Sequence, residues 1–255
     1  MKTYFNINYE LDKKQVHKSI DSVIEAGKKG YICVADGVVM NTANREKEYL
    51  SVVNGGLFAI CDSGWVPLYL KSIYGIKYEQ YCGAEIFKDI VSSRKYRMIF
   101  MGTQQSTLNA LQTEIAQTMN PDVRNMKFVE LPFRDVEDFD YPGIAKMIED
   151  DGADIIWVAL GAPKQERFMN RLLPHLKKGV MLGVGAVFKF YSGQDESRCP
   201  EWIQKHHMEF LYRIWQDPKK QLKRCFWIVA TLPQLYIGEW RRKHGNLAYT
   251  SGSVQ

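Results

Sequence analysis

The feature that most constrains the fold is a set of short apolar runs, each followed by a tight turn and a helical pattern. The run Asp154–Leu160 (DIIWVAL) carries no charge after its first residue, as expected of a central strand buried on both faces of a parallel sheet. Gly161-Ala162-Pro163 then leads into a helical pattern, and Gly102-Thr103 follows the apolar run Arg97–Met101 in the same way. This alternation predicts an α/β fold, a Rossmann-like, mostly parallel sheet with helices on both faces.

Other elements follow from the same patterns. Val16, Ile20 and Val23 recur at helical spacing and predict a helix over residues 13–26. Further strands are expected at residues 31–34, 37–40, 57–61, 127–131 and 180–188, and further helices at residues 45–53, 67–74, 84–93, 104–119, 142–150 and 163–173.

The composition changes near Ser192, after which the chain is rich in tryptophan, lysine and arginine. We therefore expect a Rossmann-like core over residues 1–194 and a helical, basic C-terminal appendage over residues 195–255. Residues 213–243 hold eight lysines and arginines against two acidic residues, while the whole chain has a net charge of +5. A basic end beside apolar residues suggests binding to an anionic surface, which could be phospholipid, pyrophosphate or nucleic acid.

The number of cysteines and the hydropathy of the chain indicate in which cellular compartment the protein is expected. The five cysteines are odd in number and form no C-x-x-C pair, which argues against a disulfide framework or a zinc finger and indicates a reducing compartment. The first residues lack the apolar core of a secretory signal, and no apolar run is long enough to span a membrane. The apolar stretch 226–237 is predicted to lie at a membrane interface, or alternatively to pack on the core or on another subunit.

Candidate site residues were sought at the carboxyl ends of the strands, where open α/β sheets bind ligands. Gly102 and Thr103 precede a helix whose free amides could bind phosphate, although a tight turn would use the same residues. Gly161 ends the most apolar strand, Pro163 opens a helix, and three polar residues crowd its first turn: Lys164, Gln165 and Glu166.

Three further positions carry groups that could serve a site. Asp62 follows an apolar strand and precedes Ser63-Gly64, a position that suits a general base but also a turn residue bonding its own backbone. Thr42 and Asn44 are expected to close a short strand and open a helix, where either could be an N-cap. Gly185 would allow either a ligand or a helix to approach the backbone closely. Close packing of a helix is the preferred interpretation.

A metal site is not expected. Asp138-Phe139-Asp140 forms a D-x-D pattern, but it lies in an acidic, loop-like stretch and does not follow a buried strand. We interpret it as a solvated turn and predict no cofactor.

Several of these segments, taken in order, resemble the WecG/TagA/CpsF family of glycosyltransferases (glycosyltransferase family 26). Residues 161–166 are similar to its G-x-P-K-Q-E signature. The other similar segments lie between about residues 30 and 225 and are Thr42-Ala43-Asn44, Asp62-Ser63-Gly64, Gly183–Phe188 followed by Gly193, Arg198 and Pro200, and Glu209–Arg213 followed by Asp217-Pro218 and Lys223-Arg224.

The resemblance implies a metal-independent, inverting transferase. The donor would be a UDP-sugar, UDP-N-acetylmannosamine or a relative, and the acceptor a glycan linked to polyprenyl pyrophosphate. By position Asp62 matches the proposed catalytic base, Thr42 a nearby hydroxyl, and Gln165 a glutamine of the donor pocket. Candidates to neutralise the departing UDP are Arg213, Lys220, Lys223 and Arg224 of the appendage.

The same resemblance implies a cytoplasmic enzyme, peripheral at the inner face of the cell membrane, in bacterial surface polysaccharide synthesis. Capsule, exopolysaccharide and wall polymer are all compatible products, and a homo-oligomer is possible. Gln80 stands where the family often carries arginine, and the loop after Asp62 has one extra residue, so the donor sugar stays open.

Two alternatives from other functional classes fit parts of the sequence. An enzyme using NAD or S-adenosylmethionine would also have a Rossmann-type sheet, but the chain lacks the G-x-G-x-x-G fingerprint. A nucleic-acid-binding module could use the basic end, but the aromatic residues there are not interleaved with basic ones, and no nucleic-acid partner is expected.

Overall fold

The computed structural model describes residues 1–78, 80–193 and 230–244 of the 255-residue chain. In these residues an eight-stranded sheet has the order β1-β2-β4-β3-β8-β7-β5-β6. All neighbouring strands are parallel except β1 and β2, which form an antiparallel hairpin at one edge. The strands are β1 (Lys2–Tyr4), β2 (Ile7–Tyr9), β3 (Lys29–Ala35), β4 (Phe58–Cys61), β5 (Met98–Gly102), β6 (Lys127–Val129), β7 (Ile155–Ala159) and β8 (Gly179–Gly183).

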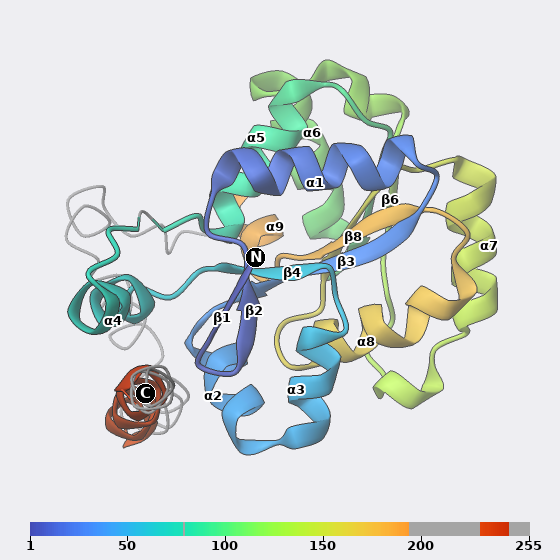
Figure 1. Cartoon of the computed structure of the whole chain (residues 1–255). Coiled ribbons are helices and arrows are strands. Elements are labelled where there is room, and N and C mark those ends of the chain that lie inside the picture. The colour runs from blue at the N-terminus through green and yellow to red at the C-terminus, as the bar shows by residue number, and fades with distance from the viewer. Residues whose placement is uncertain (79, 194–229, 245–255) are drawn as a thin grey trace.

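Helices cover both faces of the sheet, which confirms the predicted α/β class (Figure 1). One face packs against α1 (Lys13–Glu25), α5 (Gly83–Ser93), α6 (Gln105–Thr118) and α9 (Val187–Tyr191). The other packs against α2 (Gly37–Arg45), α3 (Lys47–Asn54), α4 (Trp65–Tyr74), α7 (Tyr141–Asp151) and α8 (Lys164–Leu172). Short 3₁₀ turns lie at η1 (Pro121–Asn125), η2 (Val136–Asp138) and η3 (Leu173–His175).

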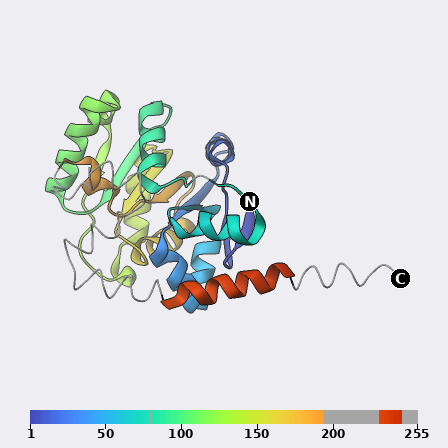
Figure 2. The ribbon, with the colours of Figure 1, turned by 90° about the vertical axis from the view of Figure 1, so that its left-hand side faces the viewer.

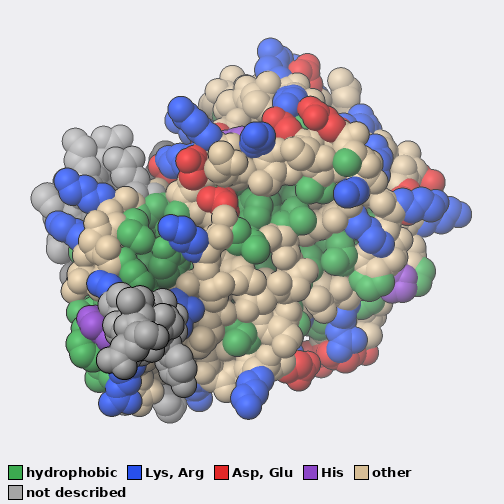
Figure 3. All heavy atoms as spheres, viewed as in Figure 1, with side chains coloured by type: hydrophobic (Ala, Val, Ile, Leu, Met, Phe, Trp, Pro, Cys, Tyr) green, Lys and Arg blue, Asp and Glu red, His purple; other side chains and the backbone are tan. Residues whose placement is uncertain are grey.

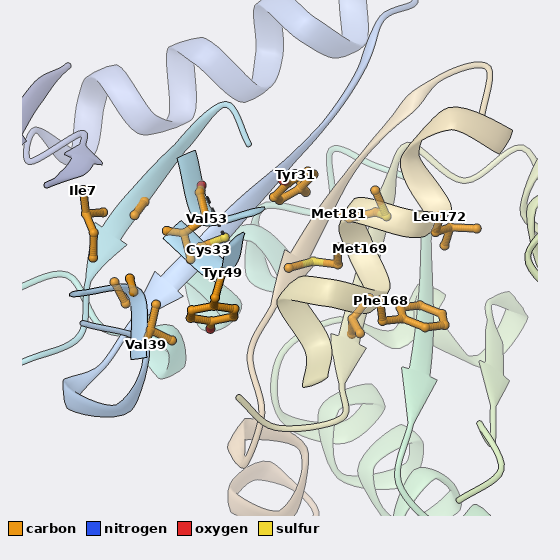
Figure 4. Packing of buried hydrophobic residues seen from close by; sticks show 14 of the residues in the cluster. Ile7, Tyr31, Cys33, Val39, Tyr49, Val53, Phe168, Met169, Leu172 and Met181 are labelled. Atoms are coloured by element: carbon orange, nitrogen blue, oxygen red, sulfur yellow. Dashed lines mark hydrogen bonds between the residues drawn. The ribbon is translucent and has the colours of Figure 1, made fainter. Parts of the chain in front are cut away.

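The sheet's centre shows why the apolar runs became strands. All five residues of β7 are buried, and Trp157 pairs with Phe100 on β5 and with Leu182 on β8. Buried on both faces, such a strand needs no polar alternation. On the second face, Phe168 and Met169 of α8 lie over the sheet beside residues of β3 and β8 (Figure 4).

The strand expected at residues 37–40 is wrong, and the one expected at residues 180–188 is right only at its start. Residues 37–40 form the start of α2, because the carboxylate of Asp36 accepts hydrogen bonds from the amides of Val38 and Val39 at 2.8 and 2.9 Å and so caps a helix. Their apolar side chains face the core at helical spacing. The expected strand at residues 180–188 ends at Gly183, because Gly185 has a φ of +55° and the chain then turns into α9.

The ends of the described chain pack together. Residues 230–244 form a helix, called here the C-terminal helix, which lies alongside α4 and the β1–β2 hairpin (Figures 1 and 2). Leu232 is buried in the core, and the buried carboxylate of Glu239 accepts hydrogen bonds from the Phe5 amide at 2.8 Å and from the Tyr74 hydroxyl at 2.7 Å. This part of the appendage therefore packs on the core, whereas the expected boundary at residues 194 and 195 lies outside the described residues.

No helix in the described part of the chain has the length and apolar character needed to cross a membrane.

Candidate active site

The strand order places the candidate site. From β3 the chain continues to β4 on one side, and β5 and β6 lie on the other side, with β8 and β7 inserted between them. The crevice of an open α/β sheet forms at such a reversal, outside the carboxyl ends of the strands. Asp62 follows β4 and Gly161 follows β7, three strand positions away. At the usual strand spacing this is about 14 Å, enough for a sugar nucleotide to lie across the ends of β3 and β8.

Asp62 lies at one end of this row of strand ends. Its amide donates to the carbonyl of Ala35 at 3.0 Å, which fixes the residue at the carboxyl end of both β4 and β3. The side chain is half-buried, and its Oδ1 accepts a hydrogen bond from Gln80 Nε2 at 3.3 Å. The next side chain, Ser63, is buried and its hydroxyl has no hydrogen-bond partner in the described residues. A carboxylate and an unsatisfied hydroxyl therefore lie together at a strand end.

The start of α5 lies beside the same carboxylate. A Cβ placed on Gly83, the first residue of α5, would be 3.8 Å from Asp62 Oδ2 and 3.2 Å from a methyl group of Val34. The close approach of helix and strand therefore leaves little room for a larger residue than glycine. It brings the positive end of the helix dipole to the side of Asp62.

The signature segment lies at the other end of the row, after β7. Gly161 has a φ of +77°, and the chain passes through a cis Ala162–Pro163 bond into α8, with Pro163 at the N-cap. Gln165 Oε1 accepts from the Gly161 amide at 3.1 Å, so the side chain closes the loop that precedes it. Gln165 and Glu166 are both buried, which the sequence alone did not indicate.

The carboxylate of Glu166 fixes the side-chain amide of Gln165 by a hydrogen bond. One carboxylate oxygen accepts from Gln165 Nε2 and the other from the Tyr49 hydroxyl, each at 2.9 Å. Burial raises the pKa of Glu166 to about 7, and the hydrogen bonds from Gln165 and Tyr49 partly offset this by favouring the charged form. Burial likewise raises the pKa of Tyr49, and the negative charge of Glu166 raises it further.

Lys164 points away from this network. Its Nζ donates to the carbonyl of Arg134 and lies 5.1 Å from the ring centroid of Phe133 and 5.5 Å from that of Phe139. In the described residues it therefore holds the loop that follows β6. Its expected role in binding substrate is not tested by these contacts.

Of the glycines in and near the expected site, Gly102 and Gly183 serve close packing. A Cβ on Gly102 would lie 2.5 Å from the carbonyl oxygen of Ala159, so Gly102 lets β5 approach β7. A Cβ on Gly183 would lie 2.8 Å from Met169 Cε, which agrees with the packing interpretation of that segment. At Gly185 the nearest atom would be Gln165 Oε1 at 3.5 Å, so this glycine borders the signature loop.

The expected phosphate site at Thr103 has a competitor. Thr103 has a φ of +45°, and the next helix begins at Gln105, whose amide donates to the carboxylate of Glu130 at 3.0 Å. An acidic group therefore already occupies part of the helix start where phosphate was expected.

Thr42 and Asn44 do not open a helix as expected. They lie in the second half of α2, whose N-cap is Asp36, and Asn44 Nδ2 donates to the carbonyl of Phe5 at 3.0 Å. Asn44 is thus committed to the turn of the β1–β2 hairpin, where its Oδ1 also accepts from Asn6 at 3.0 Å. Thr42 is half-buried, and its hydroxyl makes no hydrogen bond in the described residues.

The basic candidates of the appendage, Arg213, Lys220, Lys223 and Arg224, lie outside the described residues, as do Trp227 and Ile228. Of the apolar stretch 226–237, residues 230–237 are described, and they divide between two environments. Leu232 is buried, whereas Ile237 is 48% exposed and Trp240, just beyond the stretch, is 46% exposed.

The D-x-D pattern joins the end of η2 to the start of α7 and is not the fully solvated turn that was expected. Asp140 caps α7 by accepting from the Gly143 amide at 3.0 Å, while Phe139 is buried against Phe168 on α8. In the described parts of the chain no three histidine, cysteine, aspartate or glutamate side chains are grouped so that they could hold a metal ion.

Asp36, Tyr49 and Gln80 were not selected as site residues from the sequence. Asp36 follows an apolar run and directly precedes Gly37, much as Asp62 precedes Ser63-Gly64. The same sequence pattern that marks Asp62 could therefore have identified Asp36. Gln80 was noted only as a departure from the family pattern, and its contact with Asp62 depends on the path of the α4–α5 connection. Nothing local marks Tyr49, which reaches Glu166 from a helix more than a hundred residues away in the sequence.

Comparison with known proteins places most of the chain in one family. The model of a family described as "Glycosyl transferase WecG/TagA/CpsF family" matches residues 3–246. A protein of Bacillus subtilis (strain 168), named N-acetylglucosaminyldiphosphoundecaprenol N-acetyl-beta-D-mannosaminyltransferase, is 26% identical over 227 residues, which are 85% of this chain and 84% of that protein.

Two further relatives carry the same name. That of Bacillus spizizenii (strain ATCC 23059 / NRRL B-14472 / W23) is 24% identical over 201 residues, 77% of this chain and 75% of the relative. That of Staphylococcus aureus (strain MW2) is 24% identical over 197 residues, 74% of this chain and 73% of the relative.

Proposed function

The chain belongs to the WecG/TagA/CpsF family of glycosyl transferases, and we propose that it moves N-acetylmannosamine or a related sugar from a UDP-sugar to a polyprenyl-diphosphate-linked acceptor. The names of the relatives support this choice of acceptor and sugar, since each names a mannosaminyl group and a diphosphoundecaprenol. Gln80, in place of the arginine often found in the family, leaves room for a related donor sugar.

The observation that carries the proposal is the placement of Asp62. A half-buried carboxylate lies at the carboxyl end of β4, beside the start of α5, with Gln80 donating to one oxygen and the other oxygen on the side of Gly83. In the proposed step Asp62 takes the proton of the acceptor hydroxyl, whose oxygen then bonds to the sugar carbon. The bond from that carbon to UDP breaks with inversion, and UDP leaves with the electron pair.

The departing UDP carries negative charge that must be stabilised. In our proposal the signature loop 161–166, held by Gln165 and Glu166, borders the donor, and basic residues of the appendage face the diphosphate. Arg213, Lys220, Lys223 and Arg224 remain the candidates for that role, since they come shortly before the C-terminal helix that packs on the core.

We further propose that the enzyme works at the inner face of the cell membrane, in the synthesis of a surface polymer such as a wall polymer, capsule or exopolysaccharide. Supporting this are exposed apolar side chains on two helices, Trp65 and Leu68 on α4 and Ile237 and Trp240 on the C-terminal helix. The helices contact one another through Tyr69 and Tyr236, whose ring centroids are 5.1 Å apart. We call this surface the α4/C-terminal face.

Basic side chains surround that face. Lys71 on α4 and Arg241 on the C-terminal helix are exposed, and Lys243 Nζ lies 5.6 Å from the ring centroid of Tyr74. Aromatic and apolar side chains beside basic ones are typical of surfaces that dock on anionic lipid. Such a face would bring the carboxyl edge of the sheet close to a lipid-linked acceptor.

The test is transfer itself. The purified chain is incubated with a panel of UDP-sugars and an N-acetylglucosaminyl diphosphate on a short prenyl chain, and released UDP and glycosylated lipid are measured. We expect release of UDP that requires the acceptor and is greatest with UDP-N-acetylmannosamine or a close relative. If no UDP-sugar supports acceptor-dependent release, the proposed reaction is wrong.

A further inference from the structure

A groove of about 520 Å³ lies on the edge of the sheet next to the candidate site, between the β1–β2 hairpin and the segment that joins α4 to α5. Its apolar floor is made by Tyr4, Leu11, Ile76 and Tyr78, and Lys2 and Lys77 stand at its rim. Figure 3 shows hydrophobic side chains exposed in this region, with basic side chains beside them. None of the site residues discussed above lines it.

The charges around the groove favour an anion. Glu10 and Asp12 also line it, but Glu10 pairs with the N-terminal amine at 2.8 Å and Asp12 caps α1 by accepting from the Lys14 amide at 2.7 Å. Lys2 and Lys77, by contrast, are exposed and make no side-chain hydrogen bond or ion pair in the described residues. Glu10 is therefore paired within the chain, while Asp12 keeps its charge at the start of α1. Lys13 also lines the groove and pairs with Glu85 at 3.6 Å, so Lys2 and Lys77 are the lysines that remain available to an anion.

The groove connects two surfaces that the proposed reaction needs. On one side Tyr78 lines the groove, and Gln80, two residues later, donates to Asp62; two residues of chain span at most about 7 Å. On the other side Tyr4 packs edge-on against Tyr74 with ring centroids 5.4 Å apart, and Tyr74 contacts Glu239 and Lys243 of the C-terminal helix. The groove therefore lies between the candidate base and the α4/C-terminal face.

We propose that this groove holds the acceptor's lipid stem, with the diphosphate between Lys2 and Lys77 and the first isoprene units on the apolar floor. This inference rests on the proposed function, because it assumes that the molecule glycosylated at Asp62 is a prenyl diphosphate. The ligand carries two features in one molecule, a doubly charged group and an apolar chain. The groove offers lysine side chains for the charged group and apolar side chains for the isoprene chain, side by side in its lining.

The experiment uses the full-length chain and a charge-reversing variant, Lys2→Glu with Lys77→Glu. Binding of farnesyl diphosphate is measured by calorimetry without any donor, and KM for an N-acetylglucosaminyl farnesyl diphosphate acceptor is measured with donor present. We expect the variant to bind farnesyl diphosphate and the acceptor roughly ten-fold more weakly or worse, with UDP affinity and melting temperature unchanged. Inorganic pyrophosphate and farnesol, each carrying one feature, should bind more weakly than farnesyl diphosphate.

A matched control is Lys88→Glu with Lys146→Glu, which makes the same change in net charge on α5 and α7, away from the groove. It should behave as the unmodified chain. Equal losses in both double variants, or an unchanged acceptor KM in the groove variant, would overturn the assignment. If the unmodified chain transfers no sugar, the proposed function fails, whereas the farnesyl diphosphate measurement still tests the groove by itself.

Discussion

Asp62 is the residue on which the proposed chemistry depends most directly. Changing Asp62→Asn keeps the shape of the side chain and removes its basicity, so turnover should fall by roughly 10²–10⁴-fold, the usual contribution of a general base. Donor binding should remain, because the change leaves the signature loop intact. Steady-state kinetics and a UDP thermal-shift titration measure the two effects.

Asp135→Asn, at an exposed aspartate before η2, is a control that should leave turnover unchanged. Near-normal turnover in Asp62→Asn would instead mean that another group takes the proton of the acceptor hydroxyl.

Glu166 gives a prediction about pH and stability. Its pKa is about 7 in the folded chain against an ordinary value of 4.5, so the folded state binds the proton more tightly than the unfolded state. Between these values stability falls as pH rises, and the loss is complete above about 7. Relative to Glu166→Gln, the unmodified chain should lose on the order of 3 kcal/mol of unfolding free energy between about pH 4 and about pH 8.

Urea unfolding at the two pH values measures this difference. Glu137→Gln, at a carboxylate that is exposed on the surface, should show no comparable change between them. A constant difference between Glu166→Gln and the unmodified chain would mean that the Glu166 carboxyl titrates normally.

At these residues the sequence and the structure contribute different information. Asp62 could be selected because a polar residue directly after an apolar strand must lie at the sheet's carboxyl edge. Gln165 and Glu166 were selected for the same reason, but their burial depends on Tyr49 and Gly183, which the chain brings from α3 and β8. Partners distant in sequence leave no local pattern, so the direction of each side chain could not be predicted.

The C-terminal helix and α4 together carry the membrane prediction. Exposed aromatic and aliphatic side chains insert into the headgroup region, and neighbouring basic residues contribute about 1 kcal/mol each near anionic lipid. Changing Trp65, Leu68, Ile237 and Trp240 to serine should therefore abolish binding to anionic liposomes. Activity on an acceptor with a short, soluble chain should be largely retained, because all four side chains are exposed on the surface. Liposome sedimentation at low salt and a transfer assay measure these effects.

Leu232→Ser is the informative comparison, because this residue of the same helix is buried at 4% exposure and should lower stability instead. If the unmodified chain does not sediment with anionic liposomes, the α4/C-terminal face is better explained as a contact between subunits.

Helices and strands were predicted well where apolar residues repeat at helical spacing over several turns. They were predicted poorly where a short apolar run is compatible with either a strand or a helix. The expected helices at residues 84–93 and 104–119 agree with α5 and α6 to within a residue or so, since each has several turns of apolar spacing. Residues 37–40 are apolar enough for a strand, and only the cap by Asp36 decides for a helix. The hairpin β1–β2 was missed because its strands have three residues each and its turn uses Phe5 and Asn6, both at positive φ.

For the whole molecule, the class of fold follows from the alternation of strands and helices, but the strand order does not. Placing β8 between β3 and β7 depends on contacts among residues 29–35, 155–159 and 179–183, which are far apart in sequence. That order places the ends of β3 and β8 between Asp62 and the signature loop. The D-x-D segment packs against α8 through Phe139, and Asp140 caps α7.

This arrangement leads to a prediction about metal ions. The carboxylates of Asp138 and Asp140 lie on the surface around a core-packed Phe139, and in the described chain they are not joined by a third ligand. Charge on the departing UDP would then be met by helix amides and by lysine and arginine side chains, which supply positive charge without a metal. We expect transfer to retain most of its rate after the enzyme and substrates have been treated with EDTA, and Asp138→Asn with Asp140→Ser to leave the rate unchanged. Loss of activity that Mg²⁺ or Mn²⁺ restores, together with loss in the double variant, would identify the D-x-D segment as a metal site.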